Sequence, residues 1–110
     1  MPRDVSQRLE DVVEACEKIA RYIDGFDAAA FAADEKTFDA VVPQFEIAGE
    51  AVKSLPRELT AREPSISWRN VAGFRDLLAH AYFAVDTAVV WDAAANKAPP
   101  LRAACLRLLA

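Results

Sequence analysis

The residues of this chain that can do chemistry are gathered in one short segment, Arg75-Asp-Leu-Leu-Ala-His-Ala-Tyr82. The segment contains the only histidine among the 110 residues of the sequence. A guanidinium binds a phosphate group through two parallel hydrogen bonds, and an imidazole is the side chain that most readily transfers protons near neutral pH. Arg75 and His80 together therefore indicate chemistry on a phosphodiester. The alternative is a helix whose polar side has only a structural role.

Apolar spacing predicts that this segment belongs to a helix that begins near Trp68, with Ser67 as its cap. At about 100° per residue, Arg75, Asp76 and His80 fall on the side opposite the apolar residues. Asp76 and His80 are four residues apart, so the carboxylate can orient the imidazole. The predicted apolar side consists of Val71, Phe74, Leu77, Leu78 and Ala81.

Arg75 and His80 are five residues apart, so they cannot lie side by side on a straight helix. Both can line one groove if the helix distorts, if the long arginine reaches across, or if a second subunit completes the site. Ala72, Gly73 and Ala79 share their side of the helix and leave room for a partner. The sequence therefore predicts a homodimer, against the simpler alternative of a structural Asp76–His80 pair on a solvated surface.

The rest of the chain predicts an all-α fold, because apolar residues recur at helical spacing almost everywhere. Pro43 predicts a kink or a break near residues 40–42, and Gly49 permits close approach of another backbone. The expected elements are a helix from Asp4 to Tyr22 ended by Gly25, a helical turn from Asp27 to Ala33, a long helix capped by Asp34, a linker from Leu55 to Ser67, the helix of the motif, a helix from Thr87 to Ala95 capped by Asp86, and a last helix from Leu101 to Leu109 opened by Pro99 and Pro100.

The net charge of −4 argues against sequence-independent binding of nucleic acid by a broadly basic surface. It leaves room for a local basic cleft near Arg69 and Arg75. No apolar run reaches membrane-spanning length and no signal peptide is visible, so we expect a cytoplasmic protein. Cys16 and Cys105 lie among apolar residues, which favours two buried thiols over a disulfide. No Cys/His spacing suggests zinc, and we expect neither a metal nor another cofactor.

The segment from Trp68 to Asp86 resembles the signature of HepT-like toxins, a branch of the HEPN superfamily of small helical ribonucleases. The family signature is an arginine, four residues, a histidine, any residue and a tyrosine, which Arg75, His80 and Tyr82 match. Other stretches that agree are Phe31-Ala-Ala-Asp34, Phe45-Glu-Ile-Ala-Gly-Glu-Ala51, Leu55-Pro56 and Val90-Trp91. The resemblance covers almost the whole chain and implies one HEPN domain over residues 1–110, an up-and-down bundle of four to five helices with a kinked second helix.

The resemblance also implies an activity and its control. The protein would be a metal-independent endoribonuclease, the toxin of a type VII-like toxin–antitoxin system, acting as a dimer with both motifs in one cleft. Arg75 and His80 would be catalytic, with Asp76 supporting the site. The partner would be a nucleotidyltransferase of the MNT type, which transfers AMP to Tyr82 and silences the toxin. The rival interpretations are a non-catalytic helical module that binds the nucleotidyltransferase or a nucleotide, and an unrelated helical adaptor.

Overall fold

Aspartate side chains cap four of the helices, and the sequence predicts two of these caps, Asp34 and Asp86. The computed structural model describes residues 4–81 and 84–110. Each capping carboxylate accepts a hydrogen bond from a backbone N–H in the first turn, which satisfies a donor that has no partner within the helix. The four caps are Asp4 on the N–H of Ser6 (3.2 Å), Asp27 on Ala30 (2.8 Å), Asp34 on Thr37 (3.3 Å) and Asp86 on Ala88 (2.9 Å).

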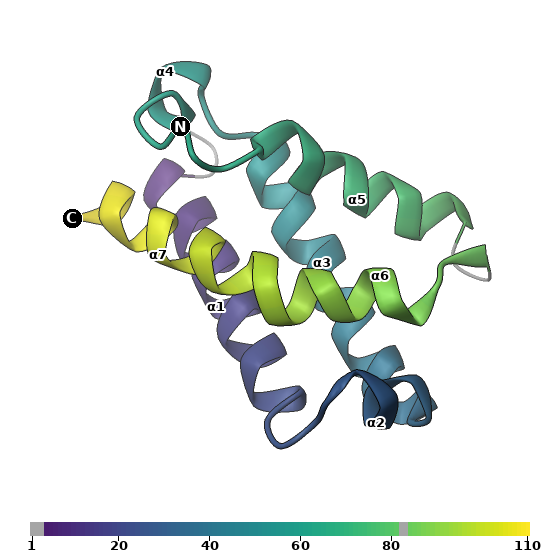
Figure 1. Ribbon diagram of the computed structural model, residues 1–110. Coiled ribbons are helices and arrows are strands. Elements are labelled where there is room, and N and C mark those ends of the chain that lie inside the picture. The colour runs from purple at the N-terminus through teal and green to yellow at the C-terminus, as the bar shows by residue number, and fades with distance from the viewer. Residues whose placement is uncertain (1–3, 82–83) are drawn as a thin grey trace.

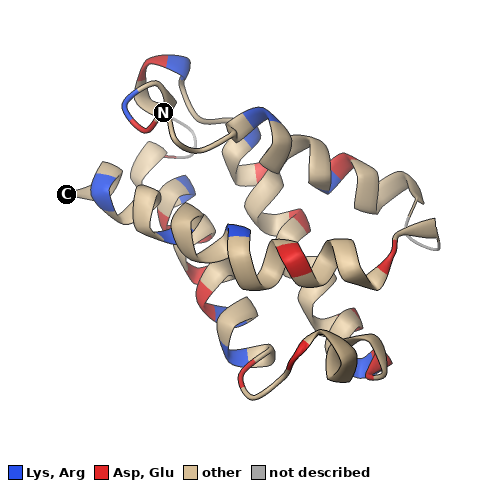
Figure 2. Cartoon of the chain, in the orientation of Figure 1, with Lys and Arg blue, Asp and Glu red and all other residues tan. Residues whose placement is uncertain are grey.

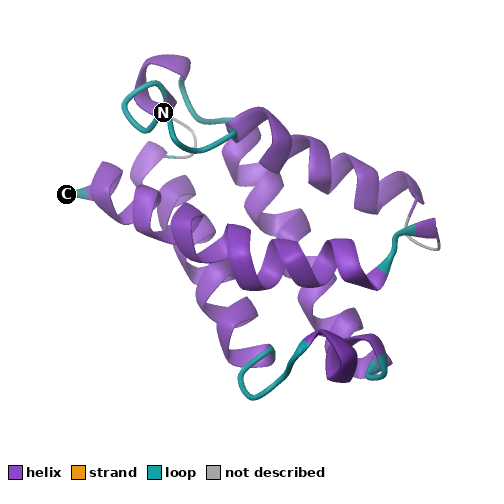
Figure 3. Ribbon diagram, in the orientation of Figure 1, coloured by secondary structure: helices purple, strands orange, loops and turns teal. Residues whose placement is uncertain are grey.

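The described residues form helices joined by short loops, with no strand among them (Figures 1 and 3). The all-α prediction is therefore confirmed. Four long helical segments and two short helices account for the described part of the chain. In order, the elements are α1 (Val5–Tyr22), α2 (Ala28–Ala32), α3 (Glu35–Lys53), α4 (Arg57–Thr60), α5 (Trp68–Ala81), α6 (Thr87–Asp92), a π-helical turn (Ala93–Lys97) and α7 (Ala98–Leu109).

Pro43 lies inside α3, which continues from Glu35 to Lys53 without interruption. Of the two outcomes expected at this proline, a break in the helix is therefore wrong. The side chain of Pro43 is exposed, whereas Val41, Val42 and Phe45 around it are buried. Burial of these neighbours against other helices holds the segment helical where its local sequence disfavours it.

The last two predicted helices form one continuous helical segment, which corrects the expected separation at Pro99 and Pro100. The π-helical turn connects α6 to α7, and the N–H of Ala98 donates to the carbonyl of Ala93, five residues earlier. The two prolines fall in the first turn of α7, where their missing N–H groups cost little. Residues 96–98, the end of the π turn and the first residue of α7, are thus helical where the sequence predicted a separation before the prolines.

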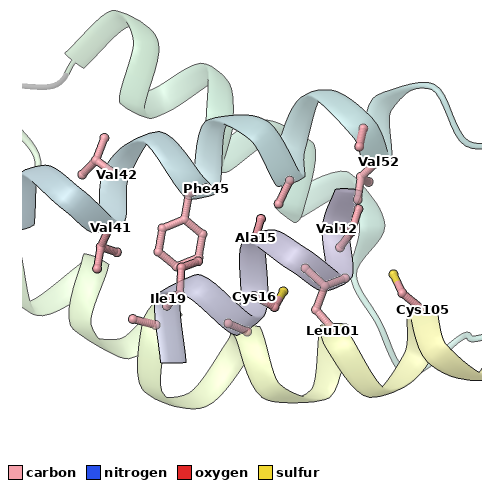
Figure 4. Close-up of a cluster of buried hydrophobic side chains, with 14 of the residues drawn as sticks. Val12, Ala15, Cys16, Ile19, Val41, Val42, Phe45, Val52, Leu101 and Cys105 are labelled. Carbon is pink, nitrogen blue, oxygen red and sulfur yellow. The ribbon is translucent and has the colours of Figure 1, made fainter. Parts of the chain in front are cut away.

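The core lies between α1, α3 and α7, with α1 packed against both of the others. Figure 4 shows side chains from these three helices pointing toward one another. Ile19, Val41 and Cys105 are completely buried. Helix α5 packs on the other side of α3, so it lies at the edge of the bundle and Leu78 is its only fully buried residue among those described.

Figure 2 shows both Lys or Arg and Asp or Glu residues distributed along the described part of the chain. No helix in the described part of the chain is long and apolar enough to cross a membrane. The two cysteines, Cys16 and Cys105, are buried free thiols, as predicted. Burial raises the pKa of each thiol to about 12.

Candidate functional site

The first turn of α5, the helix of the motif, is fixed by the linker that precedes it. The indole N–H of Trp68 donates to the carbonyls of Thr60 and Glu63, at 3.1 Å each. The backbone carbonyl of Ser67 accepts from the N–H groups of residues 70 and 71, so the helix begins where the sequence predicts. Arg107 of α7 holds the same linker through Glu63, with Nη2 at 2.7 Å from Oε1. The motif helix is therefore positioned from both α7 and the linker.

Helix α5 crosses α3 at a point of unusually close approach, at Gly49. A Cβ atom at residue 49 would collide with the Cβ of Arg75 and would lie 3.2 Å from the carbonyl oxygen of Val71. One helical turn away, the rings of Phe45 and Phe74 meet edge to face with centroids 5.2 Å apart. Gly49 of α3 therefore lies between residues 71 and 75 of α5. The close approach expected of Gly49 is confirmed.

This crossing changes the predicted orientation of Arg75. The helical wheel placed Arg75 opposite the core and Leu77 within it. In the structure the stem of Arg75 packs against α3, while Leu77 is 45% exposed. Because Gly49 has no side chain, the backbone of α3 can lie directly against residues 71 and 75 of α5. The buried side of α5 is therefore rotated toward Arg75. A helical wheel, which uses only the apolar residues of α5 itself, does not predict this contact with α3.

The guanidinium of Arg75 lies between two carboxylates. Nη1 donates to Oδ1 of Asp76 at 3.2 Å, and Nη2 is 3.5 Å from Oε2 of Glu50 on α3. The Arg75 side chain is 33% exposed, so its charge is only partly screened by water. Asp76 thus contacts Arg75, and no hydrogen bond or ion pair joins it to His80 among the described residues. The predicted Asp76–His80 pair is not formed.

Arg75 also lines a groove of about 440 Å³ over α1 and α3. Arg8 and Asp11 of α1 lie on one wall, and Glu46, Ile47 and Glu50 of α3 lie on the other. The groove therefore has basic, acidic and apolar walls.

His80 lies in the last turn of α5 with its side chain exposed. Gly73, Leu77 and His80 are spaced four and three residues apart, so they form one exposed stripe along the helix. Arg75 lies on the other side, against α3. The structure therefore brings Asp76 to Arg75, whereas no described hydrogen bond or ion pair joins His80 to either of them, and Tyr82 lies outside the described residues.

Glu50 is a contact of the motif that the sequence did not reveal, although it directly follows Gly49. The sequence feature that could have indicated this contact is a glycine that allows another helix to approach, followed directly by a charged residue. The described residues contain no group of three or more His, Cys, Asp or Glu side chains that could hold a metal ion. The chemistry available at this site is thus that of a guanidinium, a nearby pair of carboxylates and a separate imidazole.

Comparison with known proteins gives one consistent result. Residues 12–108 match the family described as "Ribonuclease HepT-like". A relative from Thermococcus cleftensis, named "Probable ribonuclease HepT", is 39% identical, with 93% of each chain covered. A protein of Methanocaldococcus jannaschii named "Putative RNase" is 36% identical over 90% of this chain and 83% of its own length. Another of that name, from Caldanaerobacter subterraneus, is 34% identical over 84% and 83%. No solved structure matches the chain.

Proposed function

The chain belongs to the HepT-like ribonuclease family, and from this premise we propose that it is the toxin of a toxin–antitoxin system, a metal-independent endoribonuclease acting on RNA in the cytoplasm. The observation that carries the proposal is Arg75, held at the edge of an open groove by contacts from Gly49 and Glu50 of α3. A guanidinium fixed in this way can bind the phosphate that is cleaved and stabilise the charge that develops on its oxygens.

His80 supplies the proton transfer in this proposal. Its imidazole takes the proton from the ribose 2′-hydroxyl, or protonates the leaving 5′-oxygen. With one histidine per chain, the two roles are divided most simply between two subunits. Because His80 is exposed and lies on a different side of α5 from the contact of Arg75 with α3, we infer that a second copy of the chain supplies the other imidazole. We therefore propose a homodimer with a composite site.

Cleavage of RNA by purified protein tests the activity. Arg75→Ala and His80→Ala should each abolish cleavage, and expression of either variant should not be toxic. Helical content and melting temperature should change little for His80→Ala, because the side chain is exposed. A chelator should leave the rate unchanged. Undiminished cleavage by either variant would refute the assignment.

The alternative is a non-catalytic helical module, and one observation favours it. Glu50 and Asp76 place two negative charges on Arg75, which weakens its attraction for an RNA phosphate. If this alternative holds, the wild-type protein binds its partner tightly but does not cut RNA at any concentration. The cleavage assay above separates the two functions directly.

Regulation of the toxin follows from the tyrosine of the motif. We place Tyr82 as the acceptor of AMP from a partner nucleotidyltransferase, by the family resemblance. Adenylylation would add bulk and negative charge seven residues from Arg75 in the sequence, which would compete for the arginine and block RNA. Tyr82→Phe should keep most of the activity yet escape neutralisation. Intact mass spectrometry after incubation with the nucleotidyltransferase and ATP should show the added AMP on the wild type only.

A further inference from the structure

The two carboxylates on Arg75 come from different places in the fold. Asp76 is the next residue on α5, so it moves together with the arginine and cannot fix it relative to the rest of the protein. Glu50 is presented from α3, and its Oε2 lies 3.5 Å from Nη2. Among the described residues, Glu50 alone forms an ion pair that ties the guanidinium to another helix. This ion pair therefore restrains the direction of the guanidinium from outside α5.

The residue before Glu50 fixes the other end of the same side chain. Gly49 leaves the space in which the Cβ and Cγ of Arg75 lie against the backbone of α3. The consecutive residues Gly49 and Glu50 thus contact the stem and the head of one arginine. A long side chain with both ends held loses much of its rotamer freedom before any substrate arrives.

We propose that Glu50 is a positioning residue for Arg75, which holds the guanidinium toward the groove while Gly49 seats its stem. This inference rests on the proposed ribonuclease function, in which Arg75 stabilises charge at the phosphate. Such stabilisation depends on geometry, since a displacement of about 1 Å can lower the rate by about 100-fold. A supporting contact from a rigid helix is the usual means of keeping that geometry.

Removing Glu50 would have two opposite effects on RNA. The free guanidinium would sample more orientations, which lowers kcat. One negative charge would also leave the groove, which reduces repulsion of RNA phosphates and favours binding. We therefore expect a fall in kcat with an unchanged or lower KM. General damage to the fold would instead lower kcat and weaken binding together.

Glu46 offers a matched control on the same helix. It lies one turn before Glu50 and lines the same groove. No ion pair joins Glu46 to Arg75 among the described contacts. Glu46→Gln and Glu50→Gln therefore remove the same charge from the same groove, and only Glu50→Gln removes the contact with the arginine.

The test combines two measurements on the full chain. The first is the ¹⁵N order parameter of the Arg75 Nε–H group, assigned by comparison with Arg75→Lys, in the absence of RNA. The second is steady-state cleavage of a model RNA. Glu50→Gln should lower the order parameter and reduce kcat about tenfold, with KM unchanged or lower. Glu46→Gln should match the wild type in the order parameter, and it should share with Glu50→Gln only the effect of the lost charge on KM.

The two measurements can fail separately. If Glu50→Gln leaves Arg75 as rigid as in the wild type, or if it loosens Arg75 without lowering kcat, Glu50 is not a positioning residue. Equal effects of Glu46→Gln and Glu50→Gln would also overturn the proposal, because they would report only the lost charge. If the wild type does not cleave RNA, the ribonuclease function fails, and the order parameter alone still decides whether Glu50 holds the arginine.

Discussion

Gly49 of α3 and Arg75 of α5 meet so closely that a Cβ atom on the glycine would occupy space already filled by the arginine stem. Because helix interiors disfavour glycine by about 0.5–1 kcal/mol relative to alanine, this residue is retained at a cost in helix stability. The contact offsets that cost by letting α5 lie against α3. The position of the proposed catalytic arginine therefore depends on a missing side chain in a different helix.

Gly49→Ala should lower the free energy of unfolding by about 1–3 kcal/mol, as is typical of an added group in a packed interface. Gly73→Ala is the matched control, because a Cβ there meets nothing within 4 Å. That variant should be stabilised by up to about 1 kcal/mol through helix propensity alone. Urea unfolding followed by circular dichroism measures both. Equal stability of the two variants would mean that α3 and α5 do not approach as closely as described.

The ion pair between Glu63 and Arg107 should make stability depend on pH. Hydrogen bonds from Arg107 lower the pKa of Glu63 below its ordinary value. A carboxyl with a lowered pKa in the folded state stabilises the fold above its unfolded pKa, and the contribution is lost as the pH falls through the folded value. Glu63→Gln should therefore be less stable than the wild type at pH 7, and the difference should vanish in acid.

Chemical denaturation at pH 7 and in strong acid measures this difference in stability. Glu58→Gln is a suitable control, since Glu58 is exposed in the same linker region and no ion pair to it is described. It should follow the wild type at every pH. A stability gap between wild type and Glu63→Gln that persists in strong acid would show that packing, and not the charge, is responsible.

The local features of the chain could be predicted from its sequence, whereas the contacts between helices could not. Asp34 could be predicted as a cap because a carboxylate that precedes a periodic apolar run commonly accepts hydrogen bonds from the first N–H groups of a helix. The rotation of α5 toward Arg75 depends on Gly49, which lies 26 residues earlier in the sequence. A helical wheel contains no information on which neighbouring backbone comes close. For the same reason the partner of Asp76 was predicted to be His80 on its own helix, and it is Arg75.

The π-helical turn before Pro99 was also beyond sequence reasoning. Two adjacent prolines mark the first turn of a helix equally well after a loop or after another helix. What joins α6 to α7 is burial of Val90, Ala94 and Ala98 on one side of the segment. Tertiary packing thus decides between alternatives that are close in local energy.

The two thiols should be inert in the folded protein. Burial raises the pKa of Cys16 and Cys105 to about 12, so only about one thiol in ten thousand is ionised at pH 8. Iodoacetamide at pH 8 should leave the native protein unmodified over an hour and label both cysteines in urea, as read by intact mass. Rapid labelling without denaturant would show that the core around α1 and α7 opens readily.

The exposed stripe on α5 should be the contact between two copies of the chain. Leu77 is 45% exposed beside His80, and a second copy seated on the stripe would cover it. Leu77→Asp should convert a dimer into a folded monomer and abolish RNA cleavage, because the composite site is lost while both motif residues remain. Leu106→Asp, on a similarly exposed leucine of α7 (40% exposed), should keep both the dimer and the activity. Light scattering at micromolar concentration, combined with the cleavage assay, separates these outcomes. A wild-type protein that scatters as one chain yet cleaves RNA would place Arg75 and His80 in a single-subunit site and would exclude the division of acid and base between two copies.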